Sequence, residues 1–165
     1  MPRLVDIDIT ARGDGKLVAW DAAGGTHEYV SPAAGGSLSY LVNQITGDVA
    51  MNVANTFFNG PSLALTEGTW LLTATITLQP ASTDICVIKL WDGTTVAAST
   101  QLTFTVGKYF TATLSGVAVV GPGGATWRIA AAPQSTTTGA IIATPTVNNT
   151  GLTNKASTLV AVQIA

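Results

Sequence analysis

The stretch "EGTWLLTATITLQP", residues 67–80, decides the fold. After its Glu-Gly start it alternates strictly, with threonines at 73, 75 and 77 opposite a row of apolar residues: Trp70, Leu72, Ala74, Ile76 and Leu78. A period of two is that of a half-buried β-strand. The outer face of such a strand is normally polar and solvated, yet here it has no charge at all. The stretch therefore predicts a β fold and leaves open what its threonine face contacts.

Charge is scarce along the whole chain. Only 10% of the 165 residues are charged and the net charge is -2, whereas an average soluble domain has about 25% charged residues. No cluster of Lys and Arg could track a phosphate backbone, so nucleic acid is not an expected partner. The long uncharged run 129–154 is interrupted by Pro and Gly, so no membrane insertion is expected. One cysteine, Cys86, excludes an internal disulfide framework.

The few charges are unevenly divided. Residues 1–48 hold six of the nine acids and three of the seven bases, although residues 49–165 are much the longer part. Within 1–48, "KLVAWD" and "THEYVSP" flank the glycine turn "AAGG" as a hairpin, and 31–37 reads as a glycine joint. A lone hairpin is marginally stable in water. We therefore expect 1–48 to be a small β-rich anchor segment that docks on the body or on another protein.

Residues 49–165 are read as strands throughout. Turn signals such as "NGP" from 59, "WDGTT" from 91 and "GPGG" from 121 separate them. The expected strands are 49–58, 62–66, 69–79, 85–91, 101–106, 109–119, 125–132, 139–147 and 157–164. Short strands at this spacing are typical of an all-β antiparallel sandwich or jelly roll. Only "LSYLVNQI", residues 38–45, is compatible with helical periodicity, as a short linking segment.

Several strands are apolar on both faces. The residues that we expect on an oligomer interface are Leu71, Val87, Trp91 and Leu159. A second face without charge resembles an interface core, where charged residues are depleted. We therefore predict that much of this second face meets other copies of the same chain. The alternative is a monomer with a wet, threonine-rich surface.

Three segments carry a resemblance to a known group. "LTEGTWLLTATITL" (65–78), "CVIKLWDGTTVAAS" (86–99) and "YFTATLSGVAVV" (109–120) resemble the C1q/TNF-like jelly rolls of bacteriophage virion proteins. The closing "ASTLVAVQIA" (156–165) ends the chain as such domains end. The resemblance implies a homotrimer located in the virion, as a head fibre, capsid decoration or tail-fibre tip. It also implies that 1–48 attaches the trimer to other virion structural proteins.

Catalytic chemistry finds little support in the sequence. The only histidine, His27, lies in the expected hairpin, far along the chain from Cys86, and could hold a metal only if repeated around a symmetry axis. A glycosidase needs two carboxylates about 5–10 Å apart, and the body has only Glu67, Asp84 and Asp92. Asp92 precedes a glycine and reads first as a turn former. We expect no enzyme, no catalytic residue, no metal and no cofactor.

Ligand binding remains open as an alternative. The residues that we expect on ligand-facing loops are Asn59, Trp127, Asn148, Asn149 and Asn154. Amides beside flat aromatics suit sugars, although Trp91 and Trp127 can equally belong to the core or an interface. The expected function is a non-enzymatic virion protein that stabilises the particle or aids adhesion. The alternative is a tail-fibre tip that recognises a host surface glycan, and scarce carboxylates disfavour a polysaccharide-degrading enzyme.

Overall fold

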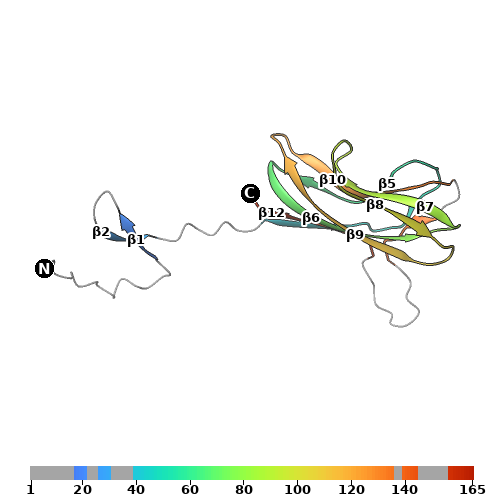
Figure 1. Ribbon diagram of the computed structural model, residues 1–165, viewed down its shortest axis with the longest axis horizontal. Coiled ribbons are helices and arrows are strands. Elements are labelled where there is room, and N and C mark those ends of the chain that lie inside the picture. The colour runs from blue at the N-terminus through green and yellow to red at the C-terminus, as the bar shows by residue number, and fades with distance from the viewer. Residues whose placement is uncertain (1–16, 22–25, 31–38, 136–138, 145–155) are drawn as a thin grey trace, which may run out of the picture. The chain divides into compact units, whose positions relative to one another are not determined.

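A computed structural model describes residues 17–21, 26–30, 39–135, 139–144 and 156–165 (Figure 1). Contacts divide the chain into two compact units, Met1–Ser37 and Leu38–Ala165. In the first unit, β1 (Leu17–Asp21) and β2 (Thr26–Val30) pair antiparallel, with Trp20 opposite His27. This is the hairpin predicted from the sequence. The expected joint 31–37 lies outside the described residues.

The second unit is a sandwich of two antiparallel sheets (Figure 1). The four-stranded β7 sheet has the order β5 (Phe58–Leu65), β10 (Ala125–Pro133), β7 (Asp84–Trp91) and β8 (Val96–Phe104). The six-stranded β6 sheet is built around β6, and its strands are β3 (Tyr40–Gln44), β12 (Thr158–Gln163), β6 (Gly68–Gln79), β9 (Phe110–Val120), β11 (Ala140–Ile141) and β4 (Val49–Ala50). All described pairings in both sheets are antiparallel, which confirms the predicted all-β class.

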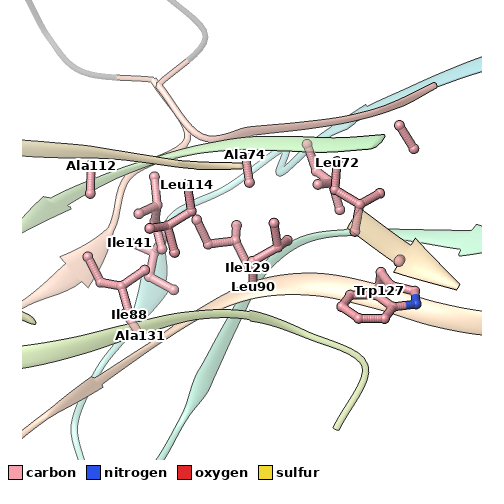
Figure 2. Close-up of a cluster of buried hydrophobic side chains, with 14 of the residues drawn as sticks. Leu72, Ala74, Ile88, Leu90, Ala112, Leu114, Trp127, Ile129, Ala131 and Ile141 are labelled. Atoms are coloured by element: carbon pink, nitrogen blue, oxygen red, sulfur yellow. The ribbon is translucent and has the colours of Figure 1, made fainter. Parts of the chain in front are cut away.

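The core lies between the two sheets. The apolar row of β6 points inward, and Leu72, Ala74 and Ile76 are fully buried. Side chains from the facing β7 sheet meet this row, among them Ile88 and Leu90 (Figure 2). The core thus uses one face of each sheet, as the alternation of residues 67–80 predicts. The threonine face of β6 is consequently the outer face.

Residues 38–45 correct one expectation. They contain a strand, β3, and no helix; Tyr40 lies opposite Val162 of β12, and Val42 lies opposite Val160. The compact jelly-roll unit therefore begins at Leu38, although the sequence assigned 38–48 to the amino-terminal segment. A segment this short has weak local preference, and pairing with β12 decides its conformation.

The segment 49–58 also differs from expectation. Only Val49–Ala50 is a strand, and the chain then crosses between the sheets through Asn55, which has a left-handed φ of 54°. Asn59, Gly60 and Pro61, read as a turn, lie inside β5. Proline is tolerated there because β5 is an edge strand with a register shift against β10. The expected strand 139–147 shortens to β11, and 145–155 lies outside the described residues.

Candidate functional site

The outer face of the β6 sheet is the first candidate site. We call it the uncharged face, because none of the residues of β3, β12, β6 and β9 carries a charge. Strand register brings its outward side chains into rows across the sheet. The outward residues are Tyr40, Val42 and Gln44 of β3, Thr158, Val160 and Val162 of β12, Leu71, Thr73 and Thr75 of β6, and Thr113, Ser115, Val117 and Val119 of β9.

One end of the uncharged face is apolar. A single row crosses all four strands and consists of Val117, Leu71, Val162 and Tyr40. In the single chain these side chains remain open to solvent, with Tyr40 71%, Val117 53% and Leu71 43% exposed, and the next β9 residue, Val119, is 80% exposed. A continuous apolar patch of this kind is typical of a protein interaction surface.

The other end of the face carries hydroxyl groups that pair with each other. We call these pairs the threonine ladder. Hydroxyl oxygens lie 3.2 Å apart in Thr73–Ser115, 3.3 Å apart in Thr75–Thr113 and 2.9 Å apart in Thr77–Thr111. Each pair joins β6 to β9 at directly opposite positions. Cross-strand hydroxyl pairs stabilise a sheet modestly.

The ladder ends in a buried network. Thr77 is only 5% exposed and donates from its hydroxyl to the Ala156 carbonyl at 2.8 Å. The Ser157 hydroxyl accepts from the Thr77 backbone N–H at 3.1 Å and donates to the Ile142 carbonyl at 2.8 Å. Ala156 and Ser157, which follow the undescribed segment 145–155, are thereby held against β6. This network fixes one border of the uncharged face.

Paired hydroxyls explain how a threonine face can be covered. A buried hydroxyl without a partner costs free energy, so a face of unpaired threonines would resist desolvation. On the uncharged face the hydroxyls of Thr73, Thr75 and Thr77 already have partners on β9. The face can therefore lose water with little penalty. This property, together with the apolar row, is that of an interface core.

The predicted interface residues do not lie together. Leu71 is on the uncharged face, whereas Val87 and Trp91 point outward from the β7 sheet on the opposite side of the sandwich. Leu159 is fully buried in the core, so its assignment to an interface is wrong. Its neighbour Val160 points outward instead, because strand residues alternate between faces.

A cleft on the outer side of the β7 sheet is the second candidate site, which we call the Lys89 cleft. Its volume is about 500 Å³, within the range of small-molecule sites. The segment between β4 and β5 forms one wall, and strands β7, β8 and β10 supply the rest. The lining residues are Asn55, Phe57, Ile85, Val87, Lys89, Gln101, Ala132 and Gln134.

An aromatic pair positions the lysine of this cleft. The rings of Phe57 and Trp91 have centroids 5.3 Å apart. The Lys89 ammonium lies 4.5 Å from the Phe57 centroid and 5.4 Å from that of Trp91. Such cation–π contacts contribute about 0.5–1 kcal/mol each at exposed sites. Among the described residues no carboxylate forms an ion pair with Lys89.

The expected ligand residues lie elsewhere. Trp127 is 2% exposed within the core, and its enclosed indole nitrogen cannot reach a ligand, so its assignment to a ligand-facing loop is wrong. Asn59 is exposed on β5 and is not a lining residue of the cleft. Asn148, Asn149 and Asn154 lie outside the described residues. Sequence patterns did not single out Asn55 or Phe57 because only the crossing segment brings them to β7.

Two carboxylates of the body, those of Asp84 and Asp92, have structural roles. The Asp92 carboxylate accepts hydrogen bonds from the Thr94 N–H at 2.8 Å and the Thr95 N–H at 2.6 Å, as expected for a turn former. Burial is the largest single influence and opposes the charged form, but the hydrogen bonds from Thr95 and Thr94 together outweigh it and lower the pKa of Asp92. Asp84 accepts from the backbone N–H of Ser135 at 2.9 Å. Within the described part of the chain, no cluster of His, Cys, Asp and Glu could hold a metal.

The described residues also contain no helix long and apolar enough to cross a membrane.

Cys86 is fully buried in β7. Burial, followed by the nearby Asp84 charge, raises the pKa of its thiol to about 12. The thiol is therefore protonated and inert at neutral pH. Cys86 is a core residue.

Comparison with known proteins identifies the class of fold. No known family profile matches the chain, and no curated protein matches it in sequence. Among solved structures, Eiger TNF from S. frugiperda is 10% identical, with a TM-score of 0.50 over 78% of this chain and 93% of that chain. The protein is thus an all-β, TNF-like jelly roll of two antiparallel sheets. This confirms the predicted fold class.

Two further structures align over most of this chain. The EclA C-terminal domain, described as a sugar-binding protein, is 14% identical, with a TM-score of 0.35 over 96% of this chain and 96% of that one. The VP2 subviral particle of infectious bursal disease virus is 10% identical, with a TM-score of 0.39 over 90% of this chain and 42% of that chain. Scores this low carry no argument about the present protein.

Proposed function

We propose that this protein is a non-enzymatic structural protein of a bacteriophage virion that assembles as a homotrimer through the uncharged face. The observation that carries the proposal is the outer surface of β3, β12, β6 and β9. It combines an exposed apolar row with hydroxyls that are already paired, and it lacks any charge. Burial of such a surface in an interface is favourable, because it removes apolar area from water.

Three-fold assembly agrees with the class of fold. The chain resembles a TNF in fold, and its strand segments resemble trimeric jelly rolls of phage virion proteins. A trimer made through this face would cover the threonines of β6, the uncharged side of that strand. The two candidate surfaces lie on opposite sheets. Assembly through the uncharged face therefore leaves the Lys89 cleft free.

We assign attachment to the amino-terminal part. Met1–Ser37 is a compact unit by itself, and its described strands β1 and β2 pair with each other. Five of the nine acids lie in this unit, so its surface chemistry differs from that of the uncharged face. We expect it to bind another virion protein. The virion is therefore the proposed location.

The test compares the full chain with residues 38–165. Both should sediment as trimers in analytical ultracentrifugation, and only the full chain should associate with particles. A monomeric 38–165 would contradict assembly through the uncharged face. Equal association of both forms with particles would instead contradict attachment by the amino-terminal unit. Immunogold imaging of virions with the labelled protein tests the location itself.

Recognition of a host glycan is a second candidate function. The Lys89 cleft favours it, because the cleft combines the aromatic ring of Phe57, side-chain amides and an apolar floor. This function is compatible with a structural trimer, since the cleft is formed within one chain. A tail-fibre tip or a decoration that aids adhesion would both use it.

A further inference from the structure

The Lys89 cleft has the parts of a binding site. Its floor is apolar and consists of Ile85 and Val87 of β7 with Ala132 of β10. Register explains this floor, because Ala132 lies directly opposite Val87 across the two strands. Gln101 flanks Val87 on the other side, from β8. Two neighbouring strand pairs therefore place an amide beside an apolar surface.

The wall of the cleft is held in place by the backbone. The Asn55 N–H donates to the Pro133 carbonyl at 2.7 Å, and the Gln134 N–H donates to the Ile85 carbonyl at 2.9 Å. These bonds anchor both the crossing segment and the end of β10 beside β7. Phe57 then packs on Trp91 and Lys89. The cleft is therefore preformed in the single chain.

The polar groups of the cleft are available to a ligand. No described residue forms a hydrogen bond with the side-chain amides of Asn55, Gln101 or Gln134, and all three residues are exposed. Each amide offers donors and an acceptor, which suits hydroxyl groups. The Lys89 ammonium is the one charged group among the lining residues. It suits a carboxylate on the ligand.

We propose that the Lys89 cleft binds an acidic saccharide, namely a pyranose ring that carries a carboxylate. The apolar floor and Phe57 contact the C–H face of the ring, the three amides bind its hydroxyls, and Lys89 binds the carboxylate. A purely apolar ligand would leave the amides without partners. A simple inorganic anion would use Lys89 but neither the floor nor the ring of Phe57.

The inference names the ligand class for the second candidate function, glycan recognition by the same cleft, and rests on that function; it does not rest on the proposed trimer. All lining residues belong to one chain, and they lie on the sheet opposite the uncharged face. A monomeric protein would therefore still bind the sugar. Sedimentation tests assembly, whereas ligand titration tests the cleft. Failure of either one is distinguishable from failure of the other.

The experiment titrates the full-length protein with two probes that differ only in the carboxylate, methyl β-D-glucuronide and methyl β-D-glucoside. Binding is followed by saturation-transfer NMR and by protein chemical shifts at low salt. We expect millimolar affinity for the glucuronide and at least about tenfold weaker binding of the glucoside, a difference of about 1.4 kcal/mol. Added salt should weaken glucuronide binding, because the contact is partly exposed.

Matched variants locate the site. Lys89→Met should remove the preference for the glucuronide, whereas Lys108→Met, which removes the same charge from an exposed turn, should retain it. Gln101→Ala, on the surface of β8, should lower the affinity for both probes several-fold without affecting the fold. Melting temperatures report whether each variant remains folded.

Three outcomes would overturn the proposal. The first is no saturable binding of the glucuronide to the unmodified protein. The second is equal affinity for both probes, which would remove the role given to Lys89. The third is glucuronide binding that does not depend on the proposed contacts, seen either as unchanged affinity in both Lys89→Met and Gln101→Ala or as displacement by sulfate at equal concentration.

Discussion

Replacement of Val117 by lysine should dissociate the proposed trimer and leave the fold of each chain intact. Val117 lies in the apolar row of the uncharged face, directly opposite Leu71. Its side chain points away from the core and is 53% exposed in the single chain. The substitution therefore disturbs no core contact. In the single chain the substitution changes the free energy of unfolding only through β propensity, whose full scale spans about 1 kcal/mol.

The expected magnitude follows from the exposed fraction. Complete burial of a valine side chain stabilises by about 1.5 kcal/mol, so covering the exposed half contributes about 0.8 kcal/mol per chain, or about 2.4 kcal/mol for three chains. Loss of this term alone weakens assembly by more than about tenfold, since about 1.4 kcal/mol corresponds to a factor of ten. An unpaired ammonium in the interface adds several kcal/mol per ion.

Analytical ultracentrifugation at micromolar concentration is the direct assay. The unmodified protein should sediment as three 16.8 kDa chains, and Val117→Lys as one. Val106→Lys is the matched control, because Val106 is also 53% exposed but lies in the turn between β8 and β9. A Val117→Lys variant that remained trimeric, or a control that dissociated equally, would refute the assignment of the interface.

Three further predictions concern the stability of the jelly roll and are measured by denaturant unfolding. Ser157→Ala leaves the Thr77 N–H without its partner and should lower the free energy of unfolding by about 1–3 kcal/mol, whereas removal of an exposed hydroxyl on β8 should not. Gly116→Ala should destabilise, because the added Cβ would lie 2.8 Å from the Ala97 Cβ and 2.9 Å from its carbonyl oxygen; an unchanged midpoint would contradict this. Burial raises the pKa of Cys86 from 9.0 to about 12. The stability that the protonated Cys86 thiol contributes to the fold is therefore complete below pH 9 and should be lost as the pH rises toward 12. Cys86→Ala should remove that part of the pH dependence.

Local patterns predicted the individual strands well. The alternation in 67–80 predicted β6 and its inward row, and the glycine turn between "KLVAWD" and "THEYVSP" predicted the pairing of β1 with β2. The Asp-Gly pair at 92 predicted a turn, which the Asp92 carboxylate caps. These features depend on neighbours close in sequence. Their physical causes, side-chain alternation and turn chemistry, act locally.

Expectations failed where distant partners decide the outcome. "LSYLVNQI" has no strong local preference, and it becomes β3 because β12 offers an unpaired edge. Pro61 reads as a turn residue, but an edge strand with a register shift accommodates it. Trp127 could have been a surface aromatic, and only the facing sheet buries it. In each case the deciding contact lies far away in the sequence.

The sequence by itself determined that the chain is β-structured, poor in charge and apolar on both faces of several strands. For strands that are apolar on both faces, it could not tell which face is the inner one, since alternation defines two faces but assigns neither to the core. Pairing in the β6 sheet turned Leu159 inward and Val160 outward, and it aligned Val117 with Leu71. Stacking of the two sheets then separated the uncharged face from the Lys89 cleft. Both surfaces are composed of residues from several strands, so tertiary structure alone brings their parts together.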